Sequence, residues 1–177
     1  MLVKKMIRWP RGLEAIENIN FQDENGFTAL MWACYHKRVG VAIVLLDVPG
    51  INVALCDRNG NTALIFACMK GLLELTLALL NAPGVKLNCT TNNGNTALIL
   101  ACFYRQNETA MALLLDPRVD RNLKDKNGMS GMSWARLYDM EDVVTVYKNL
   151  NSGNERLPLV QIHNYLSSQY IVGTPTR

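Results

Sequence analysis

The dipeptide Asn-Gly recurs along this chain at a constant interval of 34 residues, beginning at residues 25, 59, 93 and 127. Other residue types keep the same interval. In the first copy they are Thr28, Leu30 and Ala33, and the later copies carry Thr or Ser, Leu or Met, and Ala at the equivalent positions. A fixed period of about 20–50 residues is the signature of a stacked repeat architecture. The chain is therefore predicted to be an array of small units.

The second copy shows how one unit should fold. Residues 57–60 end in Asn-Gly, which tolerates the positive φ of a tight turn. Thr62 follows as a helix N-cap, because its hydroxyl can accept from free backbone N–H groups. We expect a short helix over residues 63–68 and a second, more apolar helix over residues 72–80. Pro83 lies just beyond the second helix, which it cannot continue.

Two such short helices cannot bury their apolar faces alone, so neighbouring units must stack. The repeated pattern resembles the ankyrin repeat, whose T-P-L-H-x-A box reads TALMWA at residues 28–33, TALIFA at 62–67 and TALILA at 96–101. The resemblance covers residues 23 to about 150. It implies an all-α ankyrin-repeat solenoid, in which helix-turn-helix units are joined by β-hairpin-like loops. It also implies a non-enzymatic protein–protein interaction module, a scaffold or adaptor.

The register divides the chain into units and two ends. We expect ankyrin repeats at residues 23–56, 57–90 and 91–124. Residues 125–150 should form a C-terminal capping repeat, in which Arg136 replaces a cysteine of the other units. Residues 1–22 are expected to form an N-terminal helical cap or partial repeat, and residues 151–177 a tail with a short helix.

Composition excludes several classes of protein. Apolar residues make up 49% and charged residues 19% of the chain, as in ordinary globular proteins. The net charge of +3 is too small to indicate nucleic-acid binding, which usually leaves a strongly basic stripe. No apolar run is long enough for a membrane helix, and Lys4, Lys5 and Arg8 interrupt the start, so no signal peptide is predicted. The five cysteines are then expected to be reduced, and the chain intracellular, in the cytoplasm or nucleus.

Candidate chemical sites have simpler interpretations. Cys34, Cys68 and Cys102 share one repeat position, but packed helices lie about 8–10 Å apart and a disulfide needs Cα atoms within about 7 Å. We interpret these cysteines as core residues. His36 and His163 are the only histidines, and no phosphate-binding, dinucleotide-binding or nucleophile motif is present. The chain is expected not to be an enzyme and to bind no metal or cofactor.

Trp32, Phe66, Leu100 and Trp134 form another periodic column. Its place inside the first helix of each unit favours core packing over a stack of ligand-binding side chains.

The family resemblance implies where a partner protein would bind. In ankyrin proteins the groove is formed by the hairpin tips and by the exposed end of the first helix of each unit. Carried onto this sequence, the tip positions include Phe27, Asn61, Asn95 and Met129. The helix-end column is Tyr35, Met69, Phe103 and Leu137, and the positions beside it are His36, Lys70, Tyr104 and Tyr138. An apolar or aromatic column at exposed positions usually marks an interaction site.

The sequence also fits two more specific functions. Residues 157–166 resemble the end of the suppressor-of-cytokine-signalling box, which often accompanies ankyrin repeats, and would make the chain a substrate adaptor that recruits a ubiquitin ligase. A pathogen effector or antagonist could use the same groove on a host protein. We expect a monomer whose partner is another protein, with no nucleic acid and no membrane bound.

Overall fold

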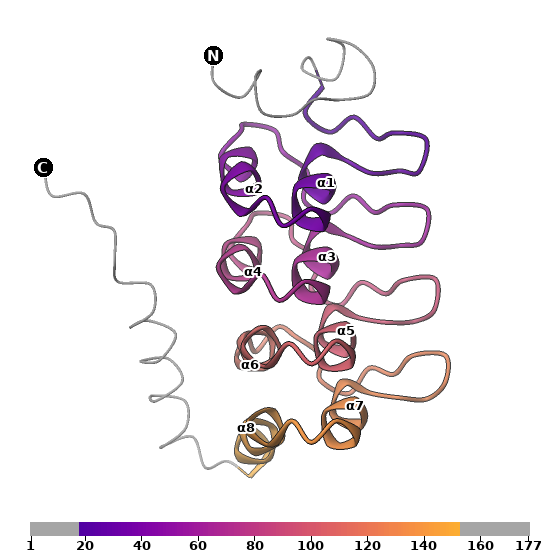
Figure 1. Cartoon of the computed structure of the whole chain (residues 1–177), viewed down its shortest axis with the longest axis vertical. Helices are drawn as coiled ribbons and strands as arrows, with labels where there is room; N and C mark the ends of the chain where they lie inside the picture. The colour runs from indigo at the N-terminus through magenta and orange to yellow at the C-terminus, as the bar shows by residue number, and fades with distance from the viewer. Residues whose placement is uncertain (1–17, 153–177) are drawn as a thin grey trace, which may run out of the picture.

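The computed structural model describes residues 18–152. Over these residues the chain forms eight helices in four antiparallel pairs, which stack in chain order (Figure 1). The all-α solenoid predicted from the period is confirmed. The first helices of the pairs form one layer and the second helices form the other. The helices are α1 (Ala29–Tyr35), α2 (Val39–Leu46), α3 (Ala63–Met69), α4 (Leu73–Leu80), α5 (Ala97–Phe103), α6 (Asn107–Leu115), α7 (Gly131–Leu137) and α8 (Glu141–Asn151).

The first helix of each pair begins at a hydroxyl side chain. The oxygen of Thr62 accepts from the backbone N–H of Ile65 at 3.3 Å, which confirms the predicted cap. Thr28, Thr96 and Ser130 cap α1, α5 and α7 in the same way. These bonds satisfy donors that the first turn of a helix otherwise leaves free.

A single left-handed residue joins the two helices of each pair. It is Gly71 in the second pair, where φ is +67°, but Lys37, Arg105 and Asp139 in the others, with φ between 53° and 56°. Residues with a Cβ atom adopt this conformation at a free-energy penalty. In the first, third and fourth pairs the tight connection is therefore imposed by the packing of the helices and not by local preference.

Four loops project from the first-helix side of the stack (Figure 1). They are hairpin-like, but within residues 18–152 their strand pairing amounts to isolated bridges, Cys56 with Thr62 and Lys124 with Ser130. Each tip is bonded to the next: the N–H of Arg58 donates to the carbonyl of Asn25 at 3.0 Å. The next two junctions repeat this bond, at 2.8 Å from Asn92 to Asn59 and 3.0 Å from Lys126 to Asn93. The tips therefore form a continuous rim.

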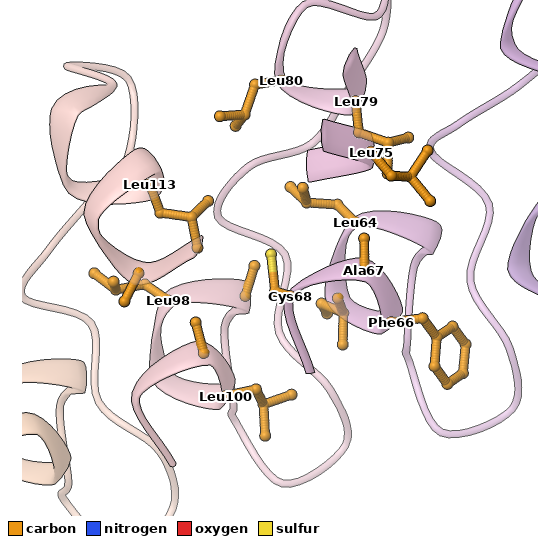
Figure 2. Packing of buried hydrophobic residues seen from close by; sticks show 14 of the residues in the cluster. Leu64, Phe66, Ala67, Cys68, Leu75, Leu79, Leu80, Leu98, Leu100 and Leu113 are labelled. Atoms are coloured by element: carbon orange, nitrogen blue, oxygen red, sulfur yellow. The ribbon is translucent and has the colours of Figure 1, made fainter. Parts of the chain in front are cut away.

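The core lies between the two layers and continues from pair to pair. Around α3, Leu64 packs with Leu75 and Leu79 of α4, and Leu98 of α5 and Leu113 of α6 continue the cluster (Figure 2). All five side chains are at most 2% exposed. Burial of a leucine contributes about 1.5–3 kcal/mol, so the shared core holds the units together.

Cys34, Cys68 and Cys102 belong to this core, as predicted. Each is fully buried, and Figure 2 shows Cys68 between the helices. The thiol of Cys102 lies where a Cβ atom on Gly131 of the next unit would approach it to 3.5 Å. The position therefore suits a small apolar side chain, and Arg136, which replaces cysteine in the last pair, is exposed.

The described residues do not reach several predicted features. Residues 1–17 and 153–177 lie outside them, and with these most of the expected N-terminal cap and most of the tail. The short helix expected at 157–166, on which the ligase-adaptor alternative rests, is therefore outside as well. Between residues 18 and 152, every helix is too short or too polar to cross a membrane.

Candidate functional site

A groove of about 750 Å³ lies between the hairpin tips and the first helices of the second, third and fourth units. Its floor is apolar and aromatic, and its rim is formed by asparagine side chains together with Thr91, Asp125 and Lys126. The floor residues are Met69 of α3, Leu100 and Phe103 of α5, Tyr104, which directly follows α5, and Trp134 of α7. The groove follows the line on which the sequence predicted partner binding.

The predicted helix-end column is only partly covered. Tyr35 is 41% exposed, Phe103 38% and Leu137 61%, whereas Met69 is half-buried. In the column beside it, Tyr104 is 44% exposed. The groove therefore presents large apolar side chains to water, and Phe103 and Tyr104 are in contact. Single exposed apolar residues are common, but adjacent ones usually mark an interaction site.

The remaining predicted residues vary in exposure. His36 is exposed, while four are half-buried: Lys70, Tyr138, Phe27 and Met129. Phe27 packs on the core, so it supports the groove wall more than it offers a free surface.

Aromatic side chains gather at the first two units. The Phe27 ring lies 4.8 Å from the Trp32 ring and 5.1 Å from the Phe66 ring, measured between centroids. Tyr35 meets Phe27 edge-on, and the ammonium of Lys70 lies 4.5 Å from the centroid of the Tyr35 ring. This cation–π contact orders the exposed tyrosine.

A second aromatic cluster lies in the groove at α5 and α7. Phe103 meets Trp134 nearly at right angles, with centroids 4.8 Å apart, and Tyr104 meets Phe103 in the same way at 5.1 Å. Tyr138 stacks on Trp134 at 5.7 Å with an interplanar angle of 22°. Edge-to-face contacts of this kind hold aromatic rings in fixed orientations. The groove floor is therefore largely preformed.

The core interpretation of the tryptophan column needs a correction. Phe66 and Leu100 are buried, but Trp32 and Trp134 are half-buried, and both Leu100 and Trp134 line the groove. Sequence reasoning also missed the rim residues Asn59, Asn93 and Asn127, although the 34-residue recurrence of this asparagine could have identified them.

Asp23 ties the first hairpin to α1. Its Oδ2 accepts from the indole N–H of Trp32 at 2.9 Å, and its Oδ1 accepts from the N–H groups of Asn25 and Phe27. Burial raises the pKa of the Asp23 carboxyl, but these hydrogen bonds and the Arg58 charge outweigh burial and hold the pKa below its ordinary value. The carboxylate therefore stabilises the turn in its charged form.

In the fourth unit the equivalent residues are Asp125 and Trp134, but no hydrogen bond joins their side chains. Asp125 accepts from the N–H groups of Asn127 and Met129, but within residues 18–152 the buried indole N–H of Trp134 has no hydrogen-bond partner. Trp134 instead stacks on Tyr138. The last groove position is therefore held by ring packing alone.

Within residues 18–152 no three His, Cys, Asp or Glu side chains are grouped to hold a metal ion. Burial raises the pKa of the Cys34, Cys68 and Cys102 thiols to about 12, so they remain protonated at neutral pH.

The family of ankyrin repeats (3 copies) matches residues 2–91 and, in a second overlapping alignment, residues 49–127. The chain belongs to the ankyrin repeat family. Ankyrin repeats are generally protein–protein interaction modules and are typically not enzymes. No curated protein matched the chain.

Beyond residue 127 the ankyrin alignment stops, but the repeated architecture does not. Helices α7 and α8 form a fourth pair that packs on α5 and α6. Their sequence departs from the ankyrin pattern at Gly131, Ser133 and Arg136.

Proposed function

We propose that this ankyrin protein binds a partner protein in the groove between its hairpin tips and first helices. The observation that carries the proposal is the exposure of Phe103 and Tyr104 side by side on the groove floor, 38% and 44% respectively. Aromatic side chains are preferred anchors of protein interfaces, because they bury a large area with few rotatable bonds. Partner binding would cover surface that is otherwise left in water.

Preformed geometry supports the same proposal. The Phe103 ring is fixed by the edge of Trp134, which in turn stacks on Tyr138. A side chain that is already ordered loses little conformational freedom on binding. These rings therefore favour a stable complex over a transient one of the same area.

We also propose that binding takes place inside the cell, in the cytoplasm or nucleus, by a monomer. Cys34, Cys68 and Cys102 are buried as thiols, and Cys56 and Cys89 are also free. Free thiols in this number are typical of a reducing compartment.

The groove is tested by the double substitution Phe103→Ala and Tyr104→Ala. A pull-down with the 177-residue chain from a lysate of its own source cells should retain a partner that the double variant loses, with binding weakened by about 2 kcal/mol or more. The control is Val44→Ala, which shortens a 48% exposed apolar side chain on α2, in the layer of the second helices. It should retain the same partner.

Two results would contradict the proposal. A partner that binds the double variant as tightly as the parent chain would lie elsewhere on the surface. If circular dichroism shows the double variant unfolded, Phe103 and Tyr104 are structural. In that case Leu137→Ser, at the 61% exposed end of the same column, gives the independent test of groove binding.

A further inference from the structure

The two layers of the array differ in their balance of charge. Acidic side chains begin the second helices: Glu74 in α4, Glu108 in α6, and Glu141 with Asp142 in α8. There they face the positive end of the helix dipole. Basic side chains are in excess on the hairpin tips and around the ends of the first helices. They are Lys37, Arg38, Arg58, Lys70, Arg105, Lys126 and Arg136, and the acids on this side are Asp23, Glu24, Asp57, Asp125 and Asp139.

The acidic side chains near the groove are engaged or remote. Asp57 accepts from the N–H of Asn61 through one oxygen and from its side-chain amide through the other. Asp125 caps its own hairpin. The exposed acids Glu24 and Asp139 lie in the first and last units. Asp57 and Asp125 keep their charges, but Arg58, Lys70, Arg105 and Lys126 outnumber them, so the middle of the groove carries an excess of positive charge.

The cations beside the groove are available to a ligand. Within residues 18–152 the one ion pair closer than 4.0 Å joins Arg118 and Asp116, on the connector after α6. Lys126 lines the groove, and Lys70 directly follows the floor residue Met69. Lys126 can thus pair with a carboxylate without breaking an internal ion pair. Lys70 already lies 4.5 Å from the centroid of the Tyr35 ring, and from there its ammonium can also face a carboxylate in the groove.

The rim offers hydrogen bonds to a peptide backbone. Asn59, Asn93 and Asn127 stand on successive hairpins, and among the described residues their side-chain amides make no hydrogen bond. An amide both donates and accepts, as an extended backbone requires. Two steps between neighbouring first helices cover about 16–20 Å, which corresponds to about five or six residues of extended chain.

We infer that the groove takes an extended, acidic peptide segment with at least one large apolar side chain. The inference rests on the proposed function and narrows it to a class of partner. The apolar side chain packs on Phe103 and Tyr104, and carboxylates before and after it face Lys70 and Lys126. The asparagine amides of the rim bond the backbone between them.

The arrangement of the rings disfavours single-stranded nucleic acid, which also combines negative charge with flat groups. Base stacking needs open ring faces. One face of Trp134 is covered by Tyr138, and Phe103 is turned edge-to-face against both Trp134 and Tyr104. A flexible aliphatic or aromatic side chain fits these edges better than a stacked base.

A random twelve-residue peptide library displayed on phage tests the inference. It is selected on the full 177-residue chain and counter-selected on the Phe103→Ala, Tyr104→Ala variant. The surviving inserts should be enriched in Asp and Glu around an apolar residue. A fluorescein-labelled consensus peptide should bind the double variant Lys70→Glu, Lys126→Glu about tenfold more weakly than the parent chain. Its binding to the parent chain should weaken as salt is added. The exposed Lys86, on the connector after α4, provides the control Lys86→Glu, which should bind normally.

The results that would contradict the acidic class of ligand differ from those that would contradict groove binding. Groove-dependent inserts that are neutral or basic would overturn the acidic class and leave groove binding intact. The inference also fails if no insert depends on the groove, and the pull-down then decides protein binding on its own. Displacement of the peptide by a twelve-nucleotide oligouridylate at equal concentration would favour nucleic acid instead.

Discussion

At the scale of single residues, the five cysteines differ mainly in their access to water. Cys34, Cys68 and Cys102 are buried, Cys56 is exposed and Cys89 is half-buried. Burial raises the pKa of the three core thiols to about 12, and the thiolate is the reactive form. Identity of residue type therefore does not imply identity of chemistry.

Thiol titration checks this difference. Ellman's reagent at pH 8 should modify Cys56 rapidly and Cys89 more slowly in the native chain. All five thiols should react in guanidinium chloride. Rapid reaction of more than two thiols in the native chain would show that the core opens readily. Fewer than five in denatured, unreduced protein would reveal a disulfide.

Asp23 gives a prediction on pH. Its pKa is lowered in the folded chain, so the carboxylate stabilises the fold above its unfolded pKa of about 3.9. That contribution is lost as the pH falls through the folded pKa. Urea unfolding between pH 6 and pH 2.5 should show a smaller loss of stability for Asp23→Asn than for the parent chain. Equal pH dependence of the two would mean that Asp23 does not stabilise the charged state.

At the scale of the elements, the hairpin rim depends on close backbone approach. A Cβ atom on Gly94 would lie 3.1 Å from the N of Lys126 in the next hairpin, whereas one on Gly128 would meet nothing within 4 Å of the described chain. The two glycines have nearly the same φ, +80° and +78°. They therefore differ in the contact to the next hairpin and not in backbone strain.

Gly94→Ala should accordingly destabilise the chain more than Gly128→Ala. Positive φ penalises alanine by about 1 kcal/mol at both positions, and only Gly94→Ala must also push the neighbouring hairpin away. The midpoint of urea unfolding measures the difference between the variants. Equal midpoints would mean that the hairpins yield freely and do not form a rigid rim.

Features that depend on contacts within a few residues could be predicted from the sequence, whereas features that depend on more distant side chains could not. The threonine caps and the helix pairs were predictable, because Thr62 and the turn before it act within a few residues. The different contacts of Trp32 and Trp134 were not predictable, although the two residues occupy the same repeat position. Phe27 packs against Trp32, but the equivalent residue of the last hairpin is Met129, and Trp134 stacks on Tyr138 instead. Such differences depend on neighbours that a repeat pattern treats as equivalent.

At the scale of the whole molecule, each helix pair touches only its neighbours along the stack. Helix α3 packs on both α1 and α5, whereas α7 packs on α5 and on its own partner α8. Stability in such an array is approximately a sum of units and nearest-neighbour interfaces. The effect of a destabilising substitution on the other units therefore depends on which unit it weakens.

Leu64 and Met132 allow a matched test, because they occupy the same register and are 2% and 3% exposed. Truncation of either to alanine should destabilise its unit by about 2–5 kcal/mol. In Met132→Ala, faster amide hydrogen exchange should remain confined to α7 and α8, which can unfold while α5 keeps its other contacts. In Leu64→Ala it should spread to α1, α2, α5 and α6, because α3 packs on α1 and α5 and its partner α4 packs on α2 and α6. Uniform acceleration in both variants would instead show that the array unfolds as one unit, and that its interfaces outweigh the stability of each pair.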